Sequence, residues 1–533
     1  MVLRNRFKDS ASIGSSEPEG LQKMDEVLKD MSLQKMRDRL EDLQNSTLEN
    51  INEQLSTLVG EIMKDVEKCG VSHEFNQLFN KNNKKSTSRH GQLRDKKFIP
   101  RNSLLTDLFD IKHISTIHNI FVVIISFLFL HSSIGDYFET GSINFGLSTI
   151  QTTFQGFFTI AILWICMFVA TQFVYTFFSI WAHIHVQLTP KTTSIYIWDR
   201  LWIILYILYQ ITFMCGFAYL VRLNHYTFGT GMAFFCEQAR FMMKCHAFVR
   251  SNITRVLNHN DSLKPQTGVQ NQILPGFSKY LYFLFAPTLI YQDSYPRTKE
   301  IRWGFLLWNV FETIMVLFLL SNLTERFIFN VFDDYGTVHY ETKKLLFKII
   351  GLTCPALFIY FSGFYLFLHS WHNAWAEGLR FADRLFYKDW WNATNFSEYF
   401  RKWNIIVHDW LYNYVYKDLH ENFGRNNKLF PFLSVFIISS IFHEYIVAMS
   451  IGFFYPVMFF FFAGIGLFAI FITKQLEKIT KNAGNMFMWT GLSFGNGLMI
   501  AFYSMEFFAR RNCDYQNDSM FASIIPHSWV CNK

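Results

Sequence analysis

An ionisable pair, His443 and Glu444, lies in the middle of an apolar stretch, residues 429–473, that is long enough for two membrane-spanning helices. Ionisable side chains at membrane depth are costly, so they are usually found where they line a cavity, bind a ligand or move a proton. A neutral imidazole in a dry site resists protonation, which suits a general base near neutral pH. The stretch therefore predicts proton transfer at His443. A pair satisfied by hydrogen bonds inside a helix bundle is the alternative.

Two other kinds of site could include His443. A zinc-binding His-Glu-x-x-His motif needs a second histidine at position 447, where this chain has valine, so we predict no metal there. Ser439 lies one turn before His443 on the predicted helix, which leaves a serine-nucleophile triad open. No glycine-flanked nucleophile turn surrounds Ser439, and no carboxylate is clearly placed to orient the imidazole. Direct deprotonation of an incoming hydroxyl by His443 requires fewer catalytic groups than a triad and is the favoured interpretation.

Two further segments combine aromatic side chains with charge. Residues 386–392 are FYKDWWN, and residues 399–418 are YFRKWNIIVHDWLYNYVYKD. Aromatic walls with basic ends are suited to hold an anionic, partly apolar ligand at a membrane surface. An aromatic belt at the membrane interface is the alternative. The candidate ligand-binding side chains in these segments are Trp390, Asn392, Trp403 and His408.

The composition places the chain among membrane proteins. Half of its 533 residues are apolar, only 17% are charged, and 61 are phenylalanine. Eight apolar runs have the length of a membrane span: one that begins near His118, residues 156–181, 200–221, 304–320, 345–368 and 486–508, and two runs within 429–473. A ninth, residues 374–386, can span only if neighbouring helices shield its charges from lipid. We therefore expect an all-α, polytopic membrane helix bundle with about nine transmembrane helices.

Residues 232–256 differ from these runs. Apolar residues alternate there at helical spacing with charged or ionisable ones, namely Glu237, Arg240, Lys244, His246 and Arg250. Such a helix is too polar to cross lipid alone. We predict that it lies at the membrane interface or covers a bundle.

Charge and cysteine positions predict the orientation of the chain. Eight basic residues gather before the first span: Lys81, Lys84, Lys85, Arg89, Arg94, Lys96, Lys97 and Arg101. They place the N-terminus in the cytosol, and their position beside a span argues against nucleic-acid binding. An odd number of spans then places the C-terminus in the lumen. Cys513 and Cys531 flank a polar loop there, where an oxidising compartment would allow a disulfide.

The N-terminal part contains one further predicted element. Leucine, isoleucine and methionine recur at three- and four-residue spacing within residues 33–62, and charged residues fill the other faces. This pattern predicts an amphipathic helix that associates with other copies, and docking onto the membrane part of the same chain is the alternative. We divide the chain into four parts: a cytosolic tail with the oligomerisation helix (1–79), a basic linker (80–102), a membrane-embedded domain (103–510) and a lumenal loop (511–533).

The segment FYKDWWN at residues 386–392, followed by HEY at 443–445 inside an apolar run, resembles the membrane-bound O-acyltransferase superfamily. The two motifs at this spacing are specific for its sterol and diacylglycerol branch. Three further segments are similar to the sterol O-acyltransferases: FLFAPTLIYQDSYPRT (283–298), HDWLYNYVYKD (408–418) and the loop from 513 to 531. The diacylglycerol enzymes resemble the first of these only as far as its APTL portion.

The resemblance implies a multi-helix enzyme of the endoplasmic reticulum membrane that assembles through its N-terminal helices into homodimers or homotetramers. It implies transfer of a long-chain acyl group from acyl-CoA to the 3-hydroxyl of a sterol such as cholesterol. No cofactor or metal is implied, because a thioester is already an activated acyl donor. Two other functions stay open: a diacylglycerol O-acyltransferase of the same superfamily, and a non-catalytic membrane protein that binds sterol or lipid.

The resemblance also implies roles for individual residues. The family's catalytic histidine matches His443, and its catalytic asparagine, in a Trp-Asn dipeptide, matches Asn404. We expect His443 to act as general base and Asn404 to offer an amide N–H to the reacting thioester. The family's donor tunnel opens to the cytosol, and the candidate acyl-CoA contacts are Arg401, Tyr416, Lys428 and Ser439. Glu444, turned about 100° from His443 on the helix, is expected to brace the bundle.

Overall fold

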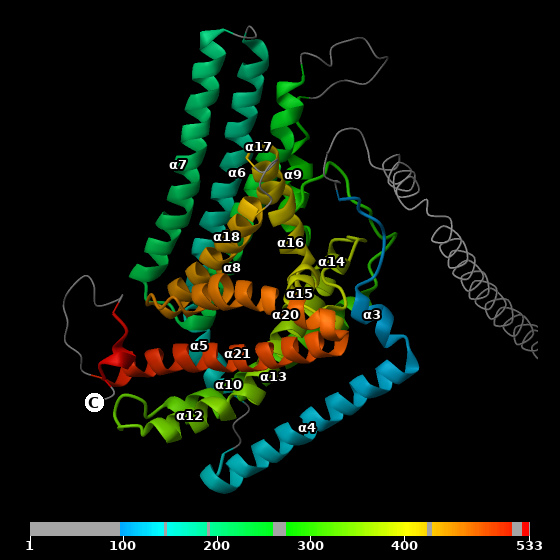
Figure 1. Ribbon diagram of the computed structural model, residues 1–533. Coiled ribbons are helices and arrows are strands. Elements are labelled where there is room, and N and C mark those ends of the chain that lie inside the picture. The colour runs from blue at the N-terminus through cyan, green and yellow to red at the C-terminus, as the bar shows by residue number, and fades with distance from the viewer. Residues whose placement is uncertain are drawn as a thin grey trace, which may run out of the picture. The chain divides into compact units, whose positions relative to one another are not determined.

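The computed structural model of the chain, shown in Figure 1, describes residues 96–142, 146–188, 192–259, 273–423, 429–513 and 525–531. The chain divides into two compact units, Met1–Arg94 and Asp95–Lys533, and every described residue belongs to the second. The predicted N-terminal helix, residues 33–62, and Lys428 lie outside the described residues. The described ranges contain helices, loops and three isolated β-bridges, which confirms the all-α prediction.

The helices are built mostly from the apolar runs, because a helix satisfies its own backbone hydrogen bonds where lipid offers none. The first half contains α3 (Leu104–Phe109), α4 (Lys112–Thr140), α5 (Leu147–Thr153), α6 (Phe157–Gln187), α7 (Thr193–Leu223), α8 (Phe228–Leu257), α9 (Phe277–Phe285), α10 (Trp303–Thr324), η2 (Glu325–Phe329) and α11 (Asn330–Phe332). The second half contains α12 (Thr342–Gly351), α13 (Thr353–Phe364), η3 (Tyr365–Trp371), α14 (His372–Gly378), η4 (Trp390–Asn392), α15 (Phe396–Trp403), α16 (Ile405–Leu411), η5 (Tyr412–Tyr416), α17 (Lys417–Asn422), α18 (Leu429–Ile451), α19 (Val457–Phe459), η6 (Phe460–Gly466), α20 (Leu467–Ile479), α21 (Lys481–Asn512) and η7 (His527–Trp529).

Seven helical stretches within the described ranges are long and apolar enough to cross a membrane: Lys112–Glu139, Phe157–Gln187, Thr193–Leu223, Trp303–Phe332, Thr342–Gly378, Leu429–Ile451 and Val457–Ile479. They coincide with the first seven apolar runs of the sequence, so the chain is a multi-pass membrane protein. The eighth predicted span lies in α21, a 32-residue helix that is not among the seven. The predicted total of about nine spans is therefore not confirmed.

The prediction of a ninth span at residues 374–386 is wrong. α14 ends at Gly378, and the following loop has a positive φ of 57° at Arg380. The buried carboxylate of Glu377 accepts hydrogen bonds from Arg302 Nη2 at 2.8 Å and Arg384 Nη2 at 2.5 Å. Because Glu377 pairs with these two guanidinium groups inside the protein, the segment folds as a charged, mostly buried loop instead of a lipid-facing helix.

Residues 232–256 were predicted to lie at the membrane interface or to cover a bundle, and the structure supports the second alternative. They form most of α8, which packs against α6, α7 and α18 and has buried residues along its length. Glu237 Oε1 accepts from Arg240 Nε at 2.6 Å, and Lys244 Nζ donates to two backbone carbonyls at the end of α9, at 2.5 and 2.6 Å. The charges that exclude α8 from lipid therefore have partners inside the bundle.

The remaining packing brings distant segments to one place. α6 and α7 lie side by side and run antiparallel in Figure 1. Residues 396–416 contact both of the long helices from the apolar stretch 429–473. η5 packs against α18, and α15 packs against α20. One large hydrophobic core joins these segments to α6, α8 and α9. Part of the second aromatic segment, η5, therefore lies next to the helix that carries His443.

Candidate active site

His443 is held in one tautomer by its own helix. Its Nδ1 lies 2.7 Å from the backbone carbonyl oxygen of Ser439, one turn earlier in α18. A carbonyl oxygen only accepts hydrogen bonds, so Nδ1 carries the proton and Nε2 carries the lone pair. The partly buried ring stacks on Phe462 of η6, with centroids 4.6 Å apart and planes 23° apart. The site thus presents a basic ring nitrogen against an aromatic wall.

Ser439 is badly placed to act as a nucleophile activated by His443. Its Oγ lies 3.4 Å from the same Nδ1 that donates to its carbonyl. A base must accept the hydroxyl proton, and this nitrogen has no lone pair to offer. The geometry therefore favours direct use of Nε2 on a substrate hydroxyl.

Glu444 faces a different side of α18 from His443. Its buried carboxylate accepts from the backbone N–H of Phe459 at 3.1 Å and from the hydroxyl of Tyr503 at 3.1 Å. These contacts tie α18 to α19 and α21. The arrangement gives Glu444 a structural function, as expected from its position on the helix.

Replacing Glu444 with alanine is expected to lower the unfolding midpoint, because it leaves two donors without their acceptor at about 1–3 kcal/mol each. Glu444→Gln keeps a carbonyl oxygen and is expected to stay near the wild-type midpoint. Thermal unfolding of the detergent-solubilised variants measures this difference. Equal midpoints for the alanine variant and the wild type would contradict the bracing function.

A second histidine in the chain has the same local geometry but a different environment. In α6, His183 Nδ1 lies 2.7 Å from the Ser179 carbonyl oxygen and 3.4 Å from the Ser179 hydroxyl. His183 is exposed on the outer face of its helix, whereas His443 is partly buried against Phe462. A Ser-x-x-x-His pair is therefore not by itself a sign of catalysis, and the enclosure of His443 is the distinguishing feature.

An aromatic cluster connects α15 to the His443 face of α18. The ring of Phe400 lies 5.4 Å from that of Phe436 and 6.2 Å from that of Phe462, which in turn stacks on His443. These phenylalanines are not among the site residues predicted from the sequence. Phe436 is seven residues before His443 and so shares its helical face, which is a usable signal. Phe462 has no such signal, because it comes from a different helix.

The two sequence motifs 386–392 and 399–405 are hydrogen-bonded to each other. Lys388 N donates to the carbonyl of Lys402, and Ile405 N donates to the carbonyl of Phe386, both at 2.9 Å. Lys402 Nζ also lies 3.0 Å from an Asp389 carboxylate oxygen. Tertiary pairing thus fixes FYKDWWN beside the Trp-Asn dipeptide, Trp403 and Asn404.

Asn404 is the N-cap of α16. Its Oδ1 accepts a hydrogen bond from Val407 N at 3.1 Å, and the amide group is oriented by that bond. The Nδ2 group has no hydrogen-bond partner among the described residues. Asn404 therefore has a fixed carbonyl end and an amide N–H2 end that can bind a ligand.

Trp390 and Trp403 form the centre of an aromatic cluster. Trp403 stacks on Tyr360 with centroids 4.5 Å apart, and it contacts Trp390 at 4.7 Å. Trp390 is 1% exposed, and within the described ranges its Nε1 has no hydrogen-bond acceptor. Asn392, two residues later, is exposed. The structure thus places Trp390 and Trp403 together and leaves Asn392 at the surface.

His408 and Tyr416 belong to one aromatic ladder. His408, Tyr412, Tyr416 and His420 stack successively along α16, η5 and α17, with centroids 6.4, 5.7 and 5.7 Å apart. Next to His408, burial alone would raise the pKa of Asp409, but contacts with His408 and with Lys96, whose Nζ is 2.6 Å away, hold that pKa below its ordinary value. The ladder is a column of nearly parallel rings that runs along α16, η5 and α17.

The other predicted site residues lie apart from these clusters or outside the description. Arg401 is exposed, and its Nε donates to the Ser397 carbonyl at 3.2 Å. Lys428 lies in the undescribed range 424–428. Cys513 and Cys531 form a disulfide with Cα atoms 6.1 Å apart. Across the described ranges, no three His, Cys, Asp or Glu side chains converge as metal ligands would.

Comparisons with known proteins agree with the sequence motifs. Residues 147–505, which include Asn404 and His443, match the MBOAT (membrane-bound O-acyltransferase) family. The chain is 36% identical over 454 residues to sterol O-acyltransferase 1 of Mus musculus, covering 85% of this chain and 82% of that relative. It is 33% identical over 442 residues to sterol O-acyltransferase 2 of Homo sapiens, covering 82% and 81%. The chain therefore belongs to the membrane-bound O-acyltransferase family, on its sterol O-acyltransferase branch, and is an acyltransferase.

Proposed function

We propose that the protein transfers a long-chain fatty acyl group from acyl-CoA to the 3-hydroxyl of a sterol such as cholesterol, giving a steryl ester and free CoA. The observation that carries the proposal is the environment of His443, whose Nδ1 contact with Ser439 leaves the Nε2 lone pair free and whose partly buried ring stacks on Phe462. Phe462 also contacts Phe400 of α15, the helix that ends one residue before Asn404. The names of the relatives support sterol as the acceptor. An apolar aromatic site suits a sterol better than a polar acceptor.

In the proposed reaction, Nε2 of His443 takes the proton of the sterol hydroxyl as its oxygen attacks the thioester carbonyl carbon. A C–O bond forms, and the carbonyl electron pair moves to oxygen. Collapse of this tetrahedral intermediate breaks the C–S bond, and the imidazolium returns its proton to the CoA thiolate. General-base help of this kind contributes typically about 10²–10⁴-fold.

Asn404 would stabilise the charge that develops on the carbonyl oxygen. Its Oδ1 is used by the N-cap bond, so its Nδ2 is the end that can donate to an oxyanion. We assign acyl-CoA and sterol binding to the remaining candidates: Trp390, Asn392, Arg401, Trp403, His408, Tyr416, Lys428 and Ser439. The stacked rings of His408, Tyr412 and Tyr416 would line one side of the donor site.

We place the enzyme in the endoplasmic reticulum membrane, with the N-terminus in the cytosol, the C-terminus in the lumen, and residues 33–62 joining copies into a homodimer or homotetramer. The basic linker and the Cys513–Cys531 disulfide support this orientation. In sealed microsomes, a membrane-impermeant thiol reagent is expected to leave Cys513 and Cys531 unlabelled even after mild reduction. Labelling from outside without detergent would contradict the lumenal placement.

The substrate assignment is tested by offering both acceptors at once. Purified full-length protein is incubated with labelled oleoyl-CoA, cholesterol and diacylglycerol, and the lipid products are separated. We expect label in steryl ester. Label in triacylglycerol alone would assign the enzyme to the diacylglycerol group instead.

A further inference from the structure

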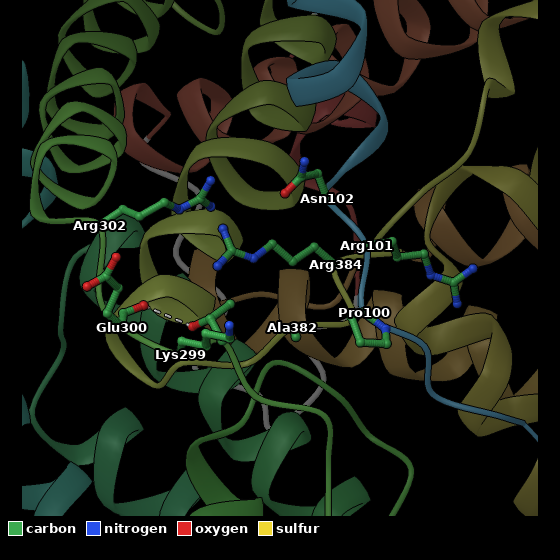
Figure 2. Close-up of a pocket in the computed structure, with 9 residues that line it drawn as sticks. Pro100, Arg101, Asn102, Lys299, Glu300, Arg302, Ala382 and Arg384 are labelled. Carbon is green, nitrogen blue, oxygen red and sulfur yellow. Dashed lines mark hydrogen bonds between the residues drawn. The ribbon is translucent and has the colours of Figure 1, made fainter.

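A cavity of about 380 Å³ lies away from the aromatic clusters around His443. It is formed where the linker around Arg101, the loop around Lys299, and the loop around Arg384 meet the start of α10 at Arg302. Figure 2 shows the guanidinium groups of Arg302 and Arg384 turned towards the same space, whereas that of Arg101 points away. None of these residues is used in the proposed acyl transfer.

The cavity has more positive charge at its base than its partners neutralise. Arg302 and Arg384 share the single buried carboxylate of Glu377, which accepts from both guanidinium groups. Arg101 pairs with Asp383 at 2.7 Å. At the rim, Glu300 is exposed next to Lys299, so these two charges offset each other. One guanidinium charge is therefore left over at the base.

Arg384 has an unused donor at this base. Its side chain is 2% exposed, and Nη2 donates to Glu377 at 2.5 Å. Among the residues that the structure describes, its buried Nη1 has no hydrogen-bond acceptor. A buried guanidinium N–H without an acceptor is costly. A phosphate oxygen is the acceptor that arginine pairs best with, and it would also balance the remaining charge.

The position of the cavity in the fold indicates where the phosphate comes from. Arg302 is the N-cap of α10, which begins a candidate membrane span at Trp303. Trp303 is 64% exposed, as is typical of tryptophan at the membrane–water interface. The cavity thus lies at the level where lipid headgroups are found.

We propose that this cavity binds the phosphate group of an anionic membrane lipid, with Arg302, Arg384 and Lys299 as its contacts. Phosphatidic acid is the simplest lipid of this class, because its headgroup is an unshielded phosphomonoester. Basic pockets between membrane helices recognise headgroups in this way. Binding would connect the linker, α10 and the loop after α14 through one ligand.

The test measures the unfolding midpoint of the full-length protein in detergent during titration with dioctanoyl phosphatidic acid. Dioctanoyl phosphatidylcholine, inorganic phosphate and adenosine 3′,5′-bisphosphate are titrated in parallel. Lys299→Glu and Arg302→Gln change exposed residues; Lys343→Glu, an exposed lysine on α12, is the matched control. We expect phosphatidic acid to stabilise the wild type and the control, and its dissociation constant to rise at least about tenfold in the two cavity variants.

Each other outcome overturns a defined part of the proposal. Equal effects of phosphatidic acid and phosphatidylcholine, or equal affinity in the control and both cavity variants, would remove the cavity as a phosphate site. Stabilisation by inorganic phosphate at the same concentrations and with the same variant dependence would replace the lipid by free phosphate. Stabilisation by the adenosine bisphosphate alone would assign the cavity to a nucleotide such as the CoA headgroup.

Discussion

The His443→Ala variant is expected to lose about 10²–10⁴-fold in kcat for steryl ester formation. His443 Nδ1 donates to the Ser439 carbonyl, so Nε2 is the ring nitrogen available to accept the sterol hydroxyl proton. Alanine removes this base and leaves the phenylalanine walls in place, so KM for acyl-CoA and sterol is expected to change little. Steady-state rates with purified full-length protein measure both parameters.

His183→Ala is the matched control for this variant. His183 makes the same two contacts to Ser179 that His443 makes to Ser439, at the same distances, but on an exposed face of α6. It is expected to keep wild-type kcat. Full activity of His443→Ala, or an equal loss in both variants, would remove His443 from the chemical step.

The Asn404→Asp variant is expected to lose about 10²–10³-fold in kcat, which corresponds to about 2.7–4 kcal/mol for one lost oxyanion donor. Aspartate caps a helix as well as asparagine does, so the bond to Val407 N is kept and the unfolding midpoint is expected to stay near wild type. A carboxylate has no N–H to donate to the oxyanion. The variant therefore separates catalysis from capping.

Asn404→Ala completes this comparison, because it removes the cap as well as the donor. It is expected to lose activity to a similar extent and, in addition, about 0.5–2 kcal/mol of stability. Thermal unfolding and kcat are measured on the same preparations. If Asn404→Asp were as active as the wild type and Asn404→Ala were only less stable, Asn404 would be a capping residue and no more.

Membrane-spanning helices could be predicted from the sequence because a single property, the length of an apolar run, determines them. Long apolar runs must become helices in lipid, and the seven stretches that the structure supports were all found in this way. The structure of the charged segments could not be predicted from the sequence, because the partner of a buried charge comes from a distant segment. For α8 the sequence left the membrane interface and a helix bundle both open, and the contacts of Lys244 with carbonyls at the end of α9 place its charge inside the bundle. Residues 374–386 were predicted as a shielded span, but Glu377 pairs there with two arginines.

The candidate site was predictable to a similar degree. His443 could be identified from the sequence because an ionisable residue in an apolar run is costly and therefore usually functional. Helical geometry places Glu444 on a different side of the helix and so indicates a different function for it. Phe462 and the pairing of Lys388 with Lys402 could not be read from spacing, because they join distant segments. The Arg302–Arg384 cavity was missed for the same reason: its two arginines are brought together by a carboxylate from a third segment.

The central claim, acyl transfer from CoA to a sterol at His443, is tested most directly by product stoichiometry. Purified full-length protein is given labelled oleoyl-CoA and cholesterol, and steryl ester and free CoA thiol are measured together. We predict one thiol released for each ester formed, and both products lowered by at least about 10²-fold with His443→Ala. Sterol binding without ester formation, or thiol release without ester, would contradict the proposal.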